Sequence, residues 1–196
     1  MKSRIVPCII LCAYAILFSN CKREQTGKIE NIEGDSIETV TTVNDSTLWG
    51  HLGTDTGMSA LQFITDDNDT LELYRTDPYT GTDGRLTGDI RNYTDRFAIT
   101  ISADGESMTT AINVTQLAQT WNTEDGSIDM KDDGVIISKN LAYDGWKLWN
   151  GRILLSSQQQ MEYGLVNRVD TMDIMLLTDD SLVIRNHINQ ILSFSN

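Results

Sequence analysis

Cysteine, histidine and proline are all scarce in this chain of 196 residues. The three cysteines are Cys8, Cys12 and Cys21, so nothing beyond position 21 can contribute to an internal disulfide pair. Small secreted domains often depend on such pairs, and this chain must instead be held together by side-chain packing. The two histidines, His51 and His187, are too few for a zinc site and are expected at the surface, without a catalytic role.

Positive charge is also scarce, with 15 Lys and Arg against 28 Asp and Glu and a net charge of −13. Nucleic-acid-binding proteins carry clustered basic residues, so no nucleic-acid partner is predicted. The run Asp66-Asp67-Asn68-Asp69 lacks the glycine and glutamate of a calcium loop and is predicted to be a turn. The sequence predicts no cofactor and no metal.

Residues 1–20 have the pattern of a secretory signal peptide. Lys2 and Arg4 precede an apolar run of fourteen residues, 5–18, whereas a transmembrane helix needs about 20. Removal of this segment would leave 13 basic and 28 acidic residues, a net charge of −15. Residues 21–44 are polar and are predicted to be a flexible tether.

The signal peptide ends in Phe18-Ser19-Asn20-Cys21, which resembles a relaxed lipobox of Bacteroidetes lipoproteins. Phe18 replaces the usual Leu, and Asn20 replaces the usual Gly or Ala. The resemblance implies that Cys21 carries acyl chains that attach the protein to the outer membrane, since stable anchoring takes more than one chain. The alternative is a secreted protein in which Cys21 is a free thiol.

From residue 45 onward, short β-prone runs alternate with turns, which predicts an all-β fold. A first β module is expected over residues 45–113, with strands at 48–52, 60–65, 70–75, 85–91, 97–102 and 108–113. Residues 114–121 predict a short joining helix capped by Asn113, because their apolar positions follow helical spacing. Eight further strands are predicted at 127–131, 135–138, 145–149, 152–157, 164–169, 171–177, 181–185 and 188–194. Asn150-Gly151 is the strongest hairpin signal, and this meander is typical of an up-and-down barrel.

Several segments of the second half resemble the lipocalin-like domain of Bacteroidetes lipoproteins over residues 114–196. The segments are Leu117 to Trp121, Asp132-Asp133-Gly134, Tyr143 to Lys147, Gly151 to Leu155, Asp170 to Ile174 and Asp180 to Ile184. The block from Leu48 to Ile99 resembles the amino-terminal part of longer members. The resemblance implies an antiparallel lipocalin-like barrel, and ligand capture, envelope maintenance and glycan handling all occur in the wider family. Gln119 replaces the glycine of the lipocalin Gly-x-Trp motif, so a lipophilic calyx is not implied.

Tyr143, Trp146 and Trp149 are the candidate ligand-binding residues, since aromatic side chains stack on sugar rings or acyl chains. The two tryptophans differ in parity along a predicted strand, so one is expected to point inward and the other outward. The alternative role for each is core packing. Ser36 and Ser46 each follow an aspartate and precede Ile37 and Thr47, which resembles an acceptor for Bacteroidetes O-glycosylation or simply a turn that leads into a strand.

Together these features predict a non-enzymatic, acyl-anchored envelope lipoprotein that binds a small apolar or glycan ligand or a protein partner. One alternative is a glycan-active hydrolase with an acidic pair, although 28 acidic residues single out no pair. Another is a structural, assembly or inhibitor protein of the outer membrane that acts through exposed loops such as residues 79–84.

Overall fold

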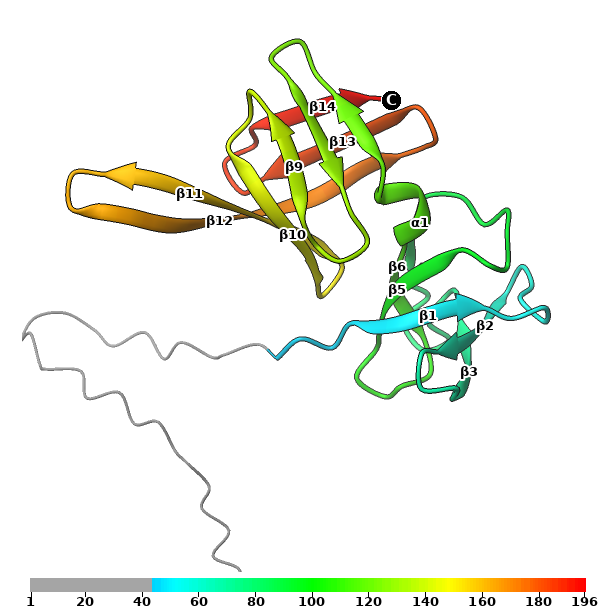
Figure 1. Cartoon of the computed structure of the whole chain (residues 1–196). Coiled ribbons are helices and arrows are strands. Elements are labelled where there is room, and N and C mark those ends of the chain that lie inside the picture. The colour runs from blue at the N-terminus through cyan, green and yellow to red at the C-terminus, as the bar shows by residue number, and fades with distance from the viewer. Residues whose placement is uncertain (1–43) are drawn as a thin grey trace, which may run out of the picture. The chain divides into compact units, whose positions relative to one another are not determined.

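The structure is a computed structural model that describes residues 44–196 (Figure 1). Residues 42–196 form one compact unit, and the described part is almost entirely β-structure. The predicted all-β fold, with a barrel in the second half and a smaller sheet before it, is confirmed. The predicted signal peptide, Cys21 and Ser36 lie outside the described residues.

The first sheet has six strands in the order β3-β2-β1-β5-β6-β4. All neighbours are antiparallel except β4 and β6, which run parallel. Its strands are β1 (Leu48–Leu52), β2 (Ala60–Thr65), β3 (Thr70–Tyr74), β4 (Arg85–Thr87), β5 (Arg96–Ile101) and β6 (Met108–Asn113). The predicted turn at residues 66–69 joins β2 to β3, with Asn68 in the left-handed region that asparagine tolerates. The apolar core of this sheet includes Leu52, Phe63 and Phe97.

Helix α1 (Val114–Leu117) is shorter than the predicted helix over residues 114–121. Asn113 caps it as expected, accepting a hydrogen bond from the backbone N–H of Gln116 at 2.9 Å. Beyond Leu117 the chain turns into a strand that pairs with residues 127–129. Trp121 is fully buried there, and its indole N–H donates to the Leu117 carbonyl at 2.9 Å. The helical spacing of Trp121 therefore reflects its burial and not a continuing helix.

Eight antiparallel strands, consecutive along the chain, form the barrel in the second half (Figure 1). They are β7 (Thr120–Asn122), β8 (Ser127–Met130), β9 (Ile136–Lys139), β10 (Tyr143–Trp149), β11 (Arg152–Met161), β12 (Gly164–Leu177), β13 (Ser181–Asn186) and β14 (Ile191–Ser195). Each strand pairs with the next except β9 and β10, which meet at one bridge between Val135 and Gly145. The barrel closes where Ser195 of β14 pairs with Asn122 of β7. The predicted hairpin at Asn150-Gly151 joins β10 to β11, and both residues have the positive φ that a tight turn requires.

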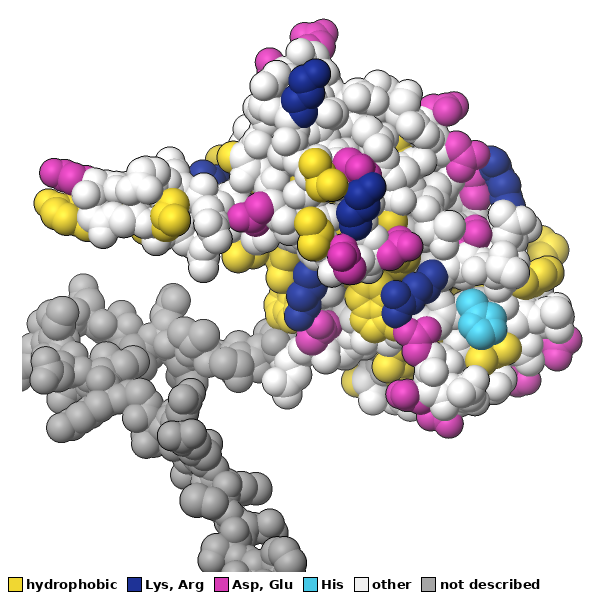
Figure 2. Space-filling view, viewed as in Figure 1, with side chains coloured by type: hydrophobic (Ala, Val, Ile, Leu, Met, Phe, Trp, Pro, Cys, Tyr) yellow, Lys and Arg dark blue, Asp and Glu magenta, His cyan; other side chains and the backbone are white. Residues whose placement is uncertain are grey.

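Strand β12 is one continuous strand where the sequence predicted two, at residues 164–169 and 171–177. Asp170 does not break it, because Arg168 lies on the same face and binds its carboxylate at 2.9 Å. Strand β10 pairs with β11 only as far as Ser157, and β13 pairs with β12 only from Met172. Residues 158–161 and 164–167 therefore pair only with each other and project beyond the barrel (Figure 1). Figure 2 shows hydrophobic side chains on this projection.

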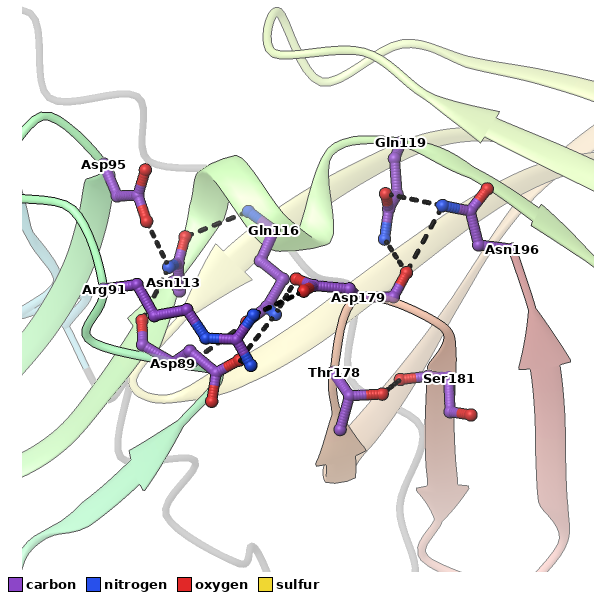
Figure 3. A network of polar contacts seen from close by, with 10 residues as sticks. All are labelled: Asp89, Arg91, Asp95, Asn113, Gln116, Gln119, Thr178, Asp179, Ser181 and Asn196. Carbon is purple, nitrogen blue, oxygen red and sulfur yellow. Dashed lines mark hydrogen bonds and ion pairs between the residues drawn. The ribbon is translucent and has the colours of Figure 1, made fainter.

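A polar network connects α1 to one end of the barrel (Figure 3). Gln116 is buried, and its amide donates to Asp179 in the β12–β13 turn at 2.6 Å and accepts from the Asp89 backbone at 2.9 Å. The Arg91 guanidinium lies 2.7 Å from the carboxylates of both Asp89 and Asp179. Below this network, Ala98, Ile112 and Val114 pack into the same apolar cluster as the barrel interior. This end of the barrel is closed by the first sheet and α1.

Candidate functional site

The opposite end of the barrel opens into a cavity of about 720 Å³. Its lining comes from the β7–β8, β9–β10 and β13–β14 turns and from the β11–β12 hairpin, which forms one wall. These segments are far apart in sequence and meet because the barrel brings alternate turns to one end. The volume falls within the range of about 300–1,000 Å³ that small-molecule sites occupy.

The cavity has an apolar floor and does not continue into the barrel. Met172 and Phe194 are both buried and line the floor beside Leu192 and Leu141. Beneath them the interior is filled by side chains with no exposed surface, which include Trp121, Ile128, Leu155 and Leu182. The site is thus a bowl at the barrel mouth, above a close-packed core.

The wall changes from apolar to polar along the two hairpin strands. On β11 the inward positions run Ile153, Leu155 and then Ser157, and Gln159 continues the same face. On β12 Asp170 lies opposite Leu155 in the strand register, and Arg168 opposite Ser157. The polar wall therefore begins where the packed core ends.

The charged groups at the mouth are three carboxylates and one guanidinium. Glu124 and Asp125 come from the β7–β8 turn, and Asp170 comes from β12. Both Nε and one terminal nitrogen of Arg168 lie 2.9 Å from the same oxygen of Asp170. The guanidinium is therefore already paired with a carboxylate. The mouth carries a surplus of negative charge.

Tyr143 is the predicted candidate that the structure places in this cavity. Burial raises the pKa of its phenol above the ordinary value of 10.0, with Asp170 acting in the same direction and Arg168 opposing it. The hydroxyl is therefore protonated at neutral pH and can donate a hydrogen bond. Tyr143 is half-buried at the start of β10.

The two candidate tryptophans lie elsewhere. Trp146 is buried, with 6% of its surface exposed, and its indole N–H donates to the Lys131 carbonyl at 2.9 Å. Trp149 is half-buried at the end of β10, beside the Asn150-Gly151 turn and away from the cavity lining. The structure thus brings only Tyr143 of the three to the mouth.

Trp146 borders a second, smaller cleft of about 290 Å³ between the barrel and the first sheet. There the Arg96 guanidinium lies 4.9 Å from the centre of the Trp49 ring and 2.6 Å from a carboxylate oxygen of Asp66. Within this cleft the Arg96 guanidinium is therefore already paired with the Trp49 ring and the Asp66 carboxylate.

Other sequence expectations concern residues that lie outside both pockets. Ser46 is exposed, and its hydroxyl donates to the Asn150 side chain at 2.7 Å. His51 and His187 are both exposed. Within residues 44–196 no group of three His, Cys, Asp or Glu is placed to hold a metal ion, and no helix there is long and apolar enough to cross a bilayer.

Sequence reasoning missed most of the lining because it searched for aromatic groups and acidic pairs. The available signal was the alternation along residues 153–159, where buried aliphatic positions give way to Ser157 and Gln159 in the same parity. Such a change within one strand marks the point at which a barrel interior meets solvent or a ligand.

A family model and a solved structure each match part of this chain. Residues 113–196 match the family model described as lipocalin-like. A lipocalin-like protein from Bacteroides thetaiotaomicron, known from a crystal structure, is 29% identical over 41% of this chain and 95% of that chain, with a TM-score of 0.35. No curated protein matches the chain. By its match to the family model and by its eight-stranded antiparallel barrel, the segment 113–196 is lipocalin-like.

Proposed function

We propose that this protein is a non-enzymatic lipoprotein of the outer membrane whose lipocalin-like barrel binds a small ligand at its open end. The observation that carries the binding proposal is the cavity of about 720 Å³ at the barrel mouth. It combines an apolar floor with convergent polar groups, and small-molecule sites use both kinds of contact.

The anchoring proposal rests on the sequence of the first 21 residues. A positive start, a short apolar run and Cys21 in a lipobox-like context support export followed by acylation. Metabolic labelling with an alkyne-bearing palmitate tests this: the wild-type chain should be labelled and the Cys21→Ala variant should not. Labelling of both chains, or of neither, would contradict acylation at Cys21.

The binding proposal is tested on the full chain carrying Cys21→Ser, which removes the acyl attachment site and permits work without detergent. Its probes are neutral oligosaccharides, acidic oligosaccharides and medium-chain and long-chain fatty acids, screened by glycan microarray and titration calorimetry. At least one probe class should bind saturably. Ser157→Trp, which fills the cavity from its wall, should abolish that binding.

Ser156→Trp is the matched control, because residue 156 has the opposite parity on β11 and is not part of the cavity lining. This variant should bind like the parent chain. Failure of every probe class, or binding that survives Ser157→Trp, would overturn the proposal that the mouth is the binding site.

A further inference from the structure

We infer that the ligand of the barrel mouth is an uncharged carbohydrate, held by side-chain amides and hydroxyls over an apolar floor. This inference rests on the proposed function and adds the chemical class of the ligand. Three features of the cavity lead to it: its charge, its hydrogen-bonding groups and its depth.

Charge argues against an anionic ligand. The lining contains three carboxylates, Glu124, Asp125 and Asp170, and a single cation, Arg168, which already contacts Asp170 through two nitrogens at 2.9 Å. A carboxylate or phosphate entering the mouth would meet the surplus negative charge without a free cation to bind it. Fatty acids and acidic sugars are therefore disfavoured.

The lining offers a set of neutral polar groups that the fold leaves available. The side-chain amides of Asn140, Gln158 and Gln159 make no hydrogen bond to any residue within 44–196, and neither do the hydroxyls of Tyr143 and Ser157. Ser157 is buried as a residue, yet its hydroxyl is not among the fully buried polar atoms that lack a partner within residues 44–196, so it remains accessible from the cavity. Amides both donate and accept, as the hydroxyl groups of a sugar do.

Depth argues against a long apolar chain. An acyl chain needs a tunnel lined by apolar side chains, whereas here Trp121, Ile128 and Leu155 fill the barrel directly beneath the cavity. The accessible apolar surface is limited to a floor that includes Phe194 and Met172. Such a floor matches the apolar C–H face of a sugar ring, with the surrounding amides placed to reach its edge.

The test uses the full chain carrying Cys21→Ser and its Gln159→Leu and Gln160→Leu variants. The probes are a microarray of neutral and acidic oligosaccharides and, separately, laurate in titration calorimetry. The two glutamines are adjacent on β11 and have opposite parity, and only Gln159 lines the cavity. Neutral glycans should bind, and Gln159→Leu should weaken them by about three- to tenfold, the usual effect of losing one neutral hydrogen bond. Gln160→Leu should bind like the parent.

The other outcomes separate this inference from the proposed function. Binding of laurate or acidic glycans without neutral glycans would overturn the carbohydrate inference and leave the mouth as a binding site. Binding of neutral glycans that is equal in all three chains would also overturn it, because the amide wall would then take no part. Binding of no probe would overturn both.

Discussion

The side-chain amide of Gln116 donates a hydrogen bond of 2.6 Å to the carboxylate of Asp179, 63 positions later in the chain. This bond ties α1 to the turn between β12 and β13 (Figure 3). Because Arg91 and Asp89 join the same network, the closed end of the barrel is fixed to the first sheet by charge-assisted hydrogen bonds. Because α1 and the first sheet close this end of the barrel, the cavity opens at the opposite end.

The first prediction concerns this connection. Gln116→Leu should lower the free energy of unfolding by about 2 kcal/mol, because it removes a hydrogen bond to a charged group and leaves the Asp89 N–H without its acceptor. Urea unfolding followed by tryptophan fluorescence measures the loss. Gln160→Leu, an exposed change on the hairpin, is the control and should alter stability by less than about 0.5 kcal/mol. Equal stability of the two variants would show that the network contributes nothing.

Local signals in the sequence predicted much of the fold. The bounds of β1, β2 and β6 agree with their predicted ranges, because turn residues frame each of these short apolar runs. Strand β7 was missed because Trp121 is buried at a position that also fits helical spacing. The final strand begins at Ile191 and not at the predicted residue 188, because Asn186 accepts backbone N–H groups from residues 188 and 190 in a turn.

The candidate site was less predictable than the fold. Tyr143 could be singled out as an aromatic residue, but its neighbours across the cavity come from turns and strands distant in sequence. That Ser157 faces Arg168 depends on the register of β11 against β12, which no local pattern fixes. Trp146 was a reasonable candidate, yet composition alone cannot distinguish an inward tryptophan in a core from one in a binding site.

The second prediction concerns Gly151, in the β10–β11 turn. Its φ is 75°, and a Cβ added there would lie 2.6 Å from Oγ1 of Thr110 on β6. Gly105 has a similar φ of 79° with no neighbour within 4 Å, so Gly105→Ala measures the backbone cost alone, about 1–2 kcal/mol. Gly151→Ala should lose at least about 1 kcal/mol more, because Thr110 or the turn must move. Chemical denaturation measures the free energy of unfolding of both variants. Identical losses would mean that Thr110 on β6 moves aside at no cost, which would contradict the prediction.

The third prediction concerns the alkaline limb of stability. Burial, followed by Asp170, raises the pKa of Tyr143 above 10.0 in the folded state, so the unfolded chain releases this proton first. The contribution is fully present below about pH 10 and is lost as the pH rises through the folded pKa. Tyr143→Phe should therefore show a smaller fall in the urea midpoint between about pH 8 and about pH 11. Tyr93→Phe, which removes an exposed phenol, is the control. The prediction would be refuted if the urea midpoint of Tyr143→Phe fell with pH as steeply as that of Tyr93→Phe.

The fourth prediction concerns Ser157, a hydroxyl at an inward position of β11 that follows Ile153 and Leu155. It is buried and borders the cavity, and no other residue within 44–196 accepts or donates a hydrogen bond to its side chain. A side chain that serves only to fill space can be replaced by an aliphatic one without loss of stability. Ser157→Val should therefore keep or raise the free energy of unfolding, by up to about 1 kcal/mol, since it removes no hydrogen bond within residues 44–196 and adds apolar contact with the floor.

The same substitution should weaken glycan binding by about three- to tenfold, because the wall loses a donor and acceptor that face the ligand. Stability and binding would then change in opposite directions, which a purely structural role for Ser157 does not produce. Ser156→Val, on the other face of β11, is the control and should leave binding unchanged. If Ser157→Val were instead destabilised by more than about 1 kcal/mol with binding intact, the hydroxyl would belong to the fold and not to the site.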